Sequence, residues 1–362
     1  MLDANSHDRP LRVGSLFSGY GGLDLAVEHA LDAETVWFSE NNQQVARIFS
    51  GHSPGVPNLG DITTINWRET PPVDVLCGGF PCQDVSTVGK RAGLAPGTRS
   101  GLWSHMAKAI DALQPELVVI ENVRGLLSSS AIRPPTQGDH HDDRNPAPAT
   151  PGHLELSAWG LGDDAARPLR AAGAVLGDLA DLGMDARWIG LPASLVGAPH
   201  HRYRIFIAAY RRGTVPHPAG LGLHTGWRVP GSSTSPERDD RPEPSSDRPR
   251  LERTAWLTNQ AQRIGDAVAP DREHFRRWGG YAHAIARWEH INGRTAPAPA
   301  LLNDAKGPRP APAFVEWLMG LPAGWVTAPE HELTSNQQVA ALGNGVRPLH
   351  AAVAIGVGVE RT

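Results

Sequence analysis

Short apolar runs alternate along this chain with segments whose apolar residues recur at helical spacing. The runs at residues 11–17, 35–38, 73–76, 117–120 and 204–208 are typical of strands buried on both faces. Helical spacing is found at residues 23–31, 168–182 and 337–342. Strands that alternate with helices in this way predict an α/β fold built around a mostly parallel sheet.

The length and composition of the chain suit one large domain and one smaller domain. The chain has 362 residues, and the stretches 128–152 and 229–250, rich in Pro, Ser, Asp and Arg, are typical of flexible linkers. Residues 1–10 are polar and no run of about 18 apolar residues occurs, so we expect neither a signal peptide nor a membrane span. Two cysteines without a disulfide framework suit the reducing cytoplasm.

The two cysteines differ in their positions relative to a predicted strand. Cys77 closes the apolar run that begins at Val73, and we expect it to be a small buried hydrophobe. Cys82 follows Gly78, Gly79 and Pro81 in the loop beyond the strand. The carboxyl end of a parallel strand is where an open α/β sheet presents its ligands, so Cys82 is a candidate for chemistry.

Features that suit a nucleoside-bearing cofactor follow the first two predicted strands. A glycine-rich turn, Ser18-Gly19-Tyr20-Gly21-Gly22, connects the first strand to a helix and lets a ligand approach the backbone. Glu40 ends the second strand, where a carboxylate can bind ribose hydroxyls. Asp61 and Ile62 add a second carboxylate and an apolar contact. The glycine pattern is not the pyrophosphate-binding type, which argues against NAD.

A carboxylate also stands at the mouth of the fourth predicted strand, where Glu121 follows the run 117–120. Burial at such a position raises the proton affinity of a carboxylate, which suits a general acid, although a loop or capping carboxylate is an equal alternative on this feature alone. We expect no metal site. His140 and His141 lie in a Pro-, Ser- and Gly-rich stretch that is typical of a solvated loop.

Taken in order, these motifs resemble the C5-cytosine DNA methyltransferases. The resemblance runs from about residue 11 to the C-terminus, apart from a variable middle. One departure is that His200 and His201 precede the arginine pair where the family has a glutamine. The motifs that carry the resemblance are 17–22, Glu40, 60–62, 81–83, 121–123, 202–204 and 343–346.

The resemblance implies a Rossmann-like S-adenosylmethionine-dependent methyltransferase domain and a smaller target-recognition domain. Cys82 would be the nucleophile that adds to cytosine, Glu121 would contact its nitrogen 3, and Arg204 its carbonyl oxygen. Arg202 would lie close by, towards the DNA backbone, and complete the catalytic set. The residues expected to bind S-adenosylmethionine are Phe17, Gly19, Gly21, Gly22, Glu40, Asp61, Ile62, Pro81 and Asn344.

The expected substrate is a cytosine flipped out of double-stranded DNA. The glycine- and arginine-containing segment 83–101 suits a mobile loop beside the nucleophile, in which we expect DNA contacts from Gln83, Ser86, Lys90 and Arg91. Positive charge is gathered in residues 201–312, which hold 18 Lys and Arg against 11 Asp and Glu, whereas the whole chain has a net charge of −4. We therefore place a catalytic domain at 1–210, completed by 335–362, and a target-recognition domain at 211–334.

Two other functions compete with DNA methylation. A methyltransferase acting on RNA cytosine would use the same scaffold, but the tRNA-acting relatives carry a Cys-Phe-Thr segment in a short recognition region. This chain has no third cysteine and a long basic segment. A non-catalytic DNA-binding relative would be expected to lack the nucleophile or the cofactor glycines, and both are present. We expect a cytoplasmic monomer in a bacterial or phage-infected cell, with a cognate restriction endonuclease as a possible partner.

Overall fold

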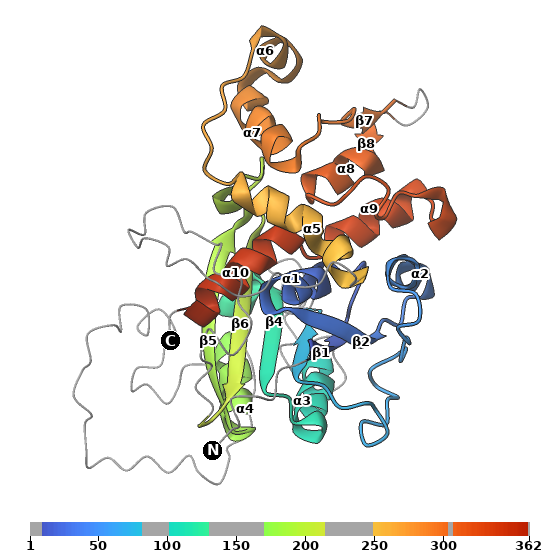
Figure 1. Cartoon of the computed structure of the whole chain (residues 1–362), viewed down its shortest axis with the longest axis vertical. Helices are drawn as coiled ribbons and strands as arrows, with labels where there is room; N and C mark the ends of the chain where they lie inside the picture. Colours follow the sequence, from blue (N-terminus) through green and yellow to red (C-terminus); the bar gives the residue numbers. More distant parts are fainter. Residues whose placement is uncertain (1–8, 82–100, 130–169, 214–248, 303–306, 361–362) are drawn as a thin grey trace, which may run out of the picture.

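A six-stranded sheet forms the centre of the large part of the protein (Figure 1). The computed structural model describes residues 9–81, 101–129, 170–213, 249–302 and 307–360. The strands lie in the order β2-β1-β3-β4-β6-β5. Their bounds are β1 Leu11–Leu16, β2 Ala33–Ser39, β3 Val75–Gly78, β4 Leu117–Val123, β5 Met184–Pro192 and β6 Tyr203–Arg211.

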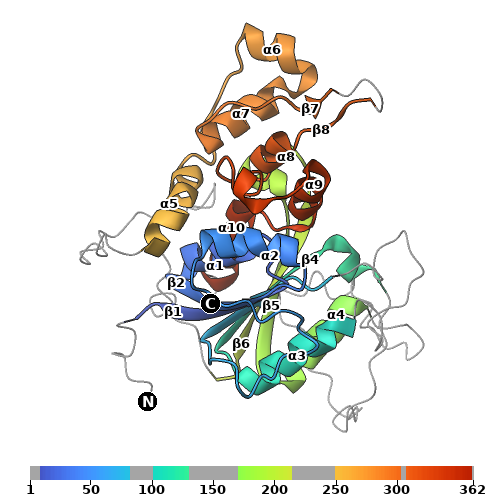
Figure 2. The same ribbon diagram turned by 90° about the vertical axis from the view of Figure 1, so that its right-hand side faces the viewer.

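Helices cover both faces of this sheet (Figure 2). On one face lie α1 (Gly22–Leu31) and α10 (Pro348–Glu360), and on the other lie α3 (Leu102–Leu113) and α4 (Ala171–Asp181). Successive side chains of a strand point to opposite faces. Leu76 of β3 accordingly packs with the α3 and α4 side, and Cys77 with the α1 and α10 side.

The sheet is parallel across four strands and antiparallel at one edge. β2, β1, β3 and β4 are parallel, while β6 runs antiparallel to both β4 and β5. The predicted α/β class is confirmed, but the antiparallel edge and β5 were not predicted. Most side chains of β5 are partly exposed, so this strand has no continuous apolar run to reveal it.

The other predicted elements differ from the structure mainly at their ends. Strand β4 continues through Glu121, which therefore belongs to the strand rather than to the loop after it. Helices α1 and α4 lie within a residue or a few residues of their predicted bounds, and α9 spans Ser335–Asn344. Helix α2 (Gln43–His52) was not predicted from the sequence.

Residues 249–334 form a mainly helical part at one end of the sheet (Figure 1). Its buried side chains, among them Trp288 and Trp317, share an apolar cluster with Tyr20, Leu342 and Leu349 from the sheet-containing part. The aromatic residues of this part differ in burial: Trp288 lies in the core, whereas Tyr281 is 71% exposed. The elements are α5 Pro249–Gln262, α6 Arg272–Trp278, α7 Ala282–Asn292, β7 Ala300–Leu301, β8 Arg309–Pro310 and α8 Pro312–Leu318, with 3-10 turns at Gly279–Tyr281 and Pro329–His331.

Candidate active site

A pocket of about 820 Å³ opens at the carboxyl ends of the four parallel strands. β2 lies on one side of β1 and β3 on the other, so the order of the strands changes direction at β1. Open α/β sheets bind ligands at such a switch point. The volume lies within the range of about 300–1,000 Å³ that is usual for small-molecule sites. The wall includes residues 15–19, 39–42, 60–62, 79–81, 121–123, Arg204 and 343–346.

Most predicted cofactor residues that the structure describes lie in this wall. Phe17, Gly19, Glu40, Asp61, Ile62, Pro81 and Asn344 line the pocket. Gly21 and Gly22 are not part of the lining. Gly21, with φ of 86°, lies at the N-terminal cap of α1, and a side chain on Gly22 would come within 2.0 Å of the Val346 carbonyl oxygen. These two glycines therefore serve the turn and its packing.

Backbone conformation shapes the pocket where the chain leaves β1. Phe17 has φ of 54°, in the left-handed region that a residue with a side chain seldom adopts. Gly19 also has a positive φ, and a Cβ there would meet no atom within 4 Å. Strained backbone of this kind gathers at ligand sites, and here it lies on the pocket wall.

Glu40 ties this turn to the end of β2. One carboxylate oxygen accepts the backbone N–H of Gly19 at 3.0 Å, and the other accepts the N–H of Asn42 at 2.9 Å. The side chain is thereby held in one orientation on the wall. The predicted role as a ribose ligand fits this placement, since each carboxylate oxygen can accept a further hydrogen bond.

Asp61 and Ile62 differ in burial. Asp61 is exposed, and its Oδ1 accepts hydrogen bonds from the backbone N–H and the hydroxyl of Thr63, which lower the pKa of the carboxyl. Ile62 is buried in the apolar cluster beneath the sheet face that α3 and α4 cover. The acidic group is thus fixed at the rim, while the apolar side chain closes the wall.

Glu121 and Arg204 form an ion pair inside the pocket wall. Arg204 Nε lies 2.7 Å from Glu121 Oε1, and both side chains are largely buried, with exposures of 16% and 10%. Burial raises the pKa of Glu121, while the charges of Arg204 and Arg202 act in the opposite direction. A side chain on Gly79 would lie 3.1 Å from Glu121 Oε2, so the glycine at the end of β3 leaves room at the carboxylate.

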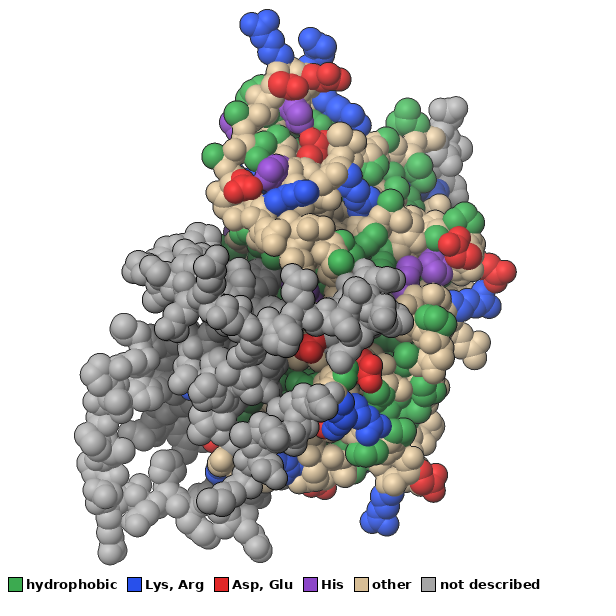
Figure 3. Space-filling model, viewed as in Figure 1, with side chains coloured by type: hydrophobic (Ala, Val, Ile, Leu, Met, Phe, Trp, Pro, Cys, Tyr) green, Lys and Arg blue, Asp and Glu red, His purple; other side chains and the backbone are tan. Residues whose placement is uncertain are grey.

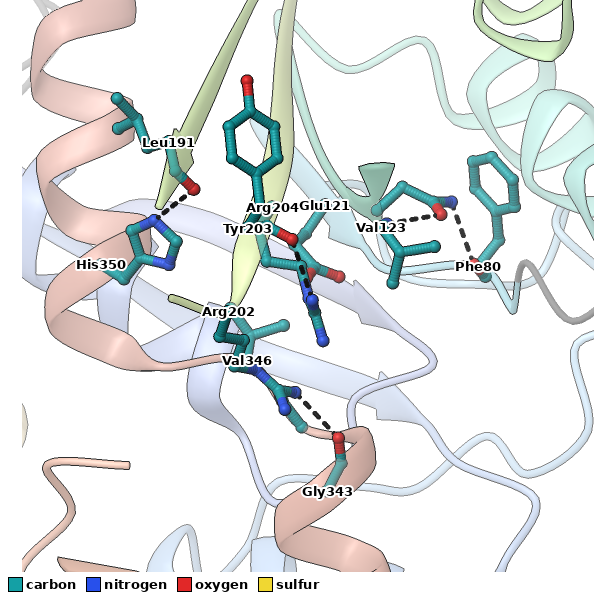
Figure 4. A network of polar contacts seen from close by, with 12 residues as sticks. Phe80, Glu121, Val123, Leu191, Arg202, Tyr203, Arg204, Gly343, Val346 and His350 are labelled. Atoms are coloured by element: carbon teal, nitrogen blue, oxygen red, sulfur yellow. Dashed lines mark hydrogen bonds and ion pairs between the residues drawn. The ribbon is translucent and has the colours of Figure 1, made fainter. Parts of the chain in front are cut away.

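Arg202 is directed away from this ion pair (Figure 4). Its Nη2 donates to the carbonyl oxygens of Gly343 at 2.8 Å and Gly345 at 2.6 Å, and the residue does not line the pocket. Sequence reasoning grouped it with the catalytic side chains near the DNA backbone. In the structure it supports the C-terminal end of α9 and the first residue after that helix.

Asn122 holds the chain just before the candidate nucleophile, and sequence reasoning gave it no role of its own. Its Nδ2 donates to the Phe80 carbonyl at 3.1 Å, and its Oδ1 accepts the backbone N–H of Val123 at 2.8 Å. Pro81 is the last described residue before position 101. The sequence signal for this role was the position of Asn122 directly after Glu121, because its amide can both donate and accept hydrogen bonds.

Five predicted residues lie outside the described parts of the chain. They are the candidate nucleophile Cys82 and the candidate DNA-contacting residues Gln83, Ser86, Lys90 and Arg91. Cys77, by contrast, is fully buried in the sheet, and burial raises the pKa of its thiol. Within the described residues, no three His, Cys, Asp or Glu side chains are grouped as a metal site, and no helix is long and apolar enough to cross a membrane.

Known proteins resemble this chain in both sequence and structure. The family description "C-5 cytosine-specific DNA methylase" matches residues 11–133. The type II methyltransferase M.NgoFVII of Neisseria gonorrhoeae is 38% identical over 128 residues, which cover 35% of this chain and 34% of that protein. M.HhaI of Haemophilus parahaemolyticus is 36% identical over 118 residues, which cover 33% of this chain and 35% of that protein. The matched segment thus spans about a third of these relatives.

The structural comparison extends over the whole chain. The crystal structure of S. pombe Dnmt2 methyltransferase aligns with a TM-score of 0.54 and 16% identity, covering 97% of this chain and 99% of that one. A DNMT2 mutant of Spodoptera frugiperda aligns with a TM-score of 0.51. At this identity the likeness concerns the fold. In sequence, residues 11–133, which supply Phe17, Glu40 and Glu121, match the C-5 cytosine-specific DNA methylase family, as the motifs predicted.

Proposed function

We propose that this protein is a DNA (cytosine-5-)-methyltransferase that uses S-adenosylmethionine. The observation that carries the proposal is the buried Glu121–Arg204 pair, which lies in the same pocket wall as Phe17 and Glu40. A carboxyl with a raised pKa beside a fixed cation suits recognition of a neutral, polar base edge. The family match over residues 11–133 supports the same reaction.

The residues around the pocket fit S-adenosylmethionine. Glu40 offers a fixed carboxylate to ribose hydroxyls, Ile62 an apolar surface to an adenine ring, and Phe17 a further ring face. Asp61 stands ready to accept from an exocyclic amine, and the 343–346 segment closes the opposite wall. The bound sulfonium supplies an electrophilic methyl group, and the role of these residues is to hold it near the strand ends.

Cys82 is the proposed nucleophile. Its thiolate would add to carbon 6 of the cytosine, which breaks the ring's aromaticity and makes carbon 5 nucleophilic towards a methyl group. After transfer, the proton on carbon 5 leaves to a base and the thiolate is expelled, so the enzyme returns to its first state. A thiolate is required, and Arg204, a cation in the pocket wall, is a candidate for lowering the thiol pKa.

Glu121 would act on the other edge of the same base. A protonated carboxyl can donate a proton to nitrogen 3 as the thiolate adds, which offsets the negative charge that develops on the ring. Burial favours this protonated form because it raises the pKa of Glu121. Arg204, fixed by its bonds to Glu121 and to the Tyr203 carbonyl, can donate to the oxygen on carbon 2.

The reaction requires a duplex with one cytosine turned out of the stack. We assign the turning and phosphate contacts to the loop that holds Gln83, Ser86, Lys90 and Arg91, and the reading of sequence to residues 211–334. Figure 3 shows Lys and Arg side chains next to Asp and Glu at the outer end of this part, around α6. Arg272, Arg276 and Arg277 of that helix are candidates for phosphate or base contacts.

The proposal also includes the setting in which the enzyme works. We infer that the protein works as a cytoplasmic monomer. Because the relatives above are named type II methyltransferases, we also infer a cognate restriction endonuclease as its partner. Exchange of residues 213–312 for the corresponding part of a relative should change which cytosine is methylated and leave the reaction intact. Methylome sequencing of cells that express the exchanged protein tests this division, and an unchanged motif would place recognition elsewhere.

The decisive experiment is a covalent trap. A duplex whose target cytosine carries fluorine at carbon 5 should form a stable adduct with the protein, because fluorine cannot leave as a cation. The target is first found by bisulfite sequencing of plasmid from expressing cells. Denaturing gels should show a shifted band with the fluorinated duplex and none with the ordinary one. Methylation of the ordinary duplex without any trapped band would refute covalent catalysis.

A further inference from the structure

Tyr20 is a buried residue of the glycine turn that neither the catalytic nor the cofactor assignment uses. It is 1% exposed, and its hydroxyl donates to the Val346 carbonyl oxygen at 2.6 Å. The aromatic ring lies against the backbone of Gly345, where a Cβ would come within 1.9 Å of it. Tyr20 thus fixes the position of Gly345 and Val346, which follow α9.

That segment is one wall of the pocket. Residues 343–346 all line it. Arg202 holds the same segment by its two bonds to the Gly343 and Gly345 carbonyls, and the close approach of Gly22 to Val346 adds a third point of contact. Gly343 and Asn344 are the last residues of α9, and residues 345–347 carry no regular secondary structure before α10, so these contacts help to set the position of the segment.

Tyr20 also meets the 249–334 part of the chain. The indole N–H of Trp325 donates to the Tyr20 backbone carbonyl at 3.1 Å. The Trp325 ring stacks on His52 of α2, with ring centroids 3.7 Å apart and planes 8° from parallel. The Trp325 carbonyl is 2.8 Å from His52 Nε2. Trp325 therefore contacts both the glycine-rich turn at residues 18–22 and helix α2.

We propose that Tyr20 is a positioning residue for the methyl donor. Its hydroxyl holds the 343–346 wall of the pocket, and its backbone carbonyl is held in turn by the indole N–H of Trp325. The inference rests on the proposed function, because it names the ligand of the pocket. The phenol remains protonated near neutral pH, since burial raises its pKa, so the hydroxyl is a constant donor.

The test is Tyr20→Phe, which removes one oxygen and keeps the ring against Gly345. Loss of a hydrogen bond to the wall should raise the dissociation constant for S-adenosylmethionine, measured by calorimetry on the full chain, about three- to tenfold. The KM for S-adenosylmethionine should rise by the same factor, while kcat at saturating cofactor falls less than twofold. A role in folding alone would lower the melting temperature and leave both constants unchanged.

Tyr210→Phe is the matched control. Tyr210 is another buried tyrosine, on β6, and its hydroxyl has no hydrogen-bond partner among the described residues. It does not line the pocket. Its variant should bind S-adenosylmethionine with the affinity of the wild type. If both tyrosine variants weaken cofactor binding equally, the effect is one of general packing and the proposal is overturned.

Trp325→Phe tests the second contact and does not depend on the folding of the tyrosine variant. It removes the N–H that donates to Tyr20 and keeps a ring beside His52. Cofactor affinity should fall about threefold, in the same direction as for Tyr20→Phe. Wild-type affinity in both variants would overturn the inference while leaving the proposed function intact. A wild-type chain that binds no S-adenosylmethionine at all would refute the proposed function itself.

Discussion

Each of the two parts of this protein buries a glutamate, and the two carboxylates are used differently. Glu121, on β4, lies in the pocket wall and pairs with the Arg204 side chain. Glu316, on α8, is 1% exposed and accepts the backbone N–H groups of Gly324, Val326 and Thr327 together with the Thr327 hydroxyl. The Glu121 carboxylate has a cationic side chain as its partner at a cavity, whereas the Glu316 carboxylate is surrounded by the loop that follows α8.

The difference shows how each part performs its task. A parallel sheet holds side chains rigidly at its strand ends, so the Glu121 carboxyl can face a ligand without losing its position. Among its described residues, the 249–334 part has no strand longer than two residues, and the loop after α8 is held by a buried acceptor instead of by a sheet. We therefore expect changes around the pocket to reduce chemistry, and equivalent changes in the 249–334 part to reduce stability or DNA reading.

The largest effect should come from Cys82→Ala, which removes the proposed nucleophile. Methyl transfer should fall to background on duplex DNA, measured by incorporation of labelled methyl groups. Cys77→Ala, on β3 five residues earlier in the sequence, is the control. It should keep most activity and cost about 1 kcal/mol of packing. Full activity of Cys82→Ala would show that the assignment of the nucleophile is wrong.

Replacement of each buried glutamate by glutamine tests the comparison directly. Glu121→Gln keeps an acceptor for Arg204 but cannot donate a proton as a carboxyl does, so kcat should fall about 100- to 10,000-fold at near wild-type stability. Glu316→Gln turns an NH2 group towards the Gly324 N–H and should lower the free energy of unfolding by about 1–3 kcal/mol. Urea unfolding and initial rates give both numbers. A loss of stability in Glu121→Gln together with a loss of kcat in Glu316→Gln would contradict the distinction between the two parts.

A smaller effect is expected at the cofactor turn. Glu40→Gln sets an NH2 group against either the Gly19 or the Asn42 N–H, and it removes a charged acceptor. The dissociation constant for S-adenosylmethionine should rise about tenfold, as judged by calorimetry. Glu34→Gln changes an exposed acid on the same strand, far from its carboxyl end, and should leave the affinity unaltered. Equal effects of the two variants would argue against a site at the strand ends.

The smallest effect concerns His274, which joins α6 to α7. Its ring contacts Glu289 at 2.7 Å and Asp271 at 2.8 Å, and these hydrogen bonds raise its pKa above the usual 6.5. A histidine pKa raised by folding stabilises the protein fully below 6.5, and this contribution is lost as the pH rises through the folded-state pKa. The melting temperature of His274→Gln should lie about 1–3 °C below wild type near pH 6. This gap should close as the pH rises through the folded-state pKa, whereas a gap independent of pH would mean that protonation of His274 does not contribute to stability.

The strand-end residues show how far sequence reasoning can reach. Glu40 and Glu121 were found because each follows or ends an apolar run, and the carboxyl ends of parallel strands meet at one edge. The role of Phe17 came from the family resemblance of its motif. The same reasoning grouped Gly21 and Gly22 with the ligand contacts, because a glycine that permits close packing and a glycine that touches a ligand look the same in sequence.

Contacts between distant segments could not be predicted in this way. Arg202 precedes β6 and was expected to point towards DNA, yet it holds the Gly343 and Gly345 carbonyls instead. That outcome depends on tertiary packing, since α10 packs on α1 and on β6, and the end of α9 with the chain leading to α10 lies next to Arg202. Nothing in the local pattern around residue 202 records this arrangement.

The sequence by itself determined the α/β class, the strand-end carboxylates and the family of residues 11–133, because these follow from local hydrophobic periodicity and from motifs a few residues long. Only the tertiary structure decided that Tyr20 meets Val346 and Trp325, which lie more than three hundred residues away along the chain. Such pairs depend on the packing of whole helices against the sheet. Burial of apolar surface drives that packing, and it has no directional code that a short stretch of sequence could carry.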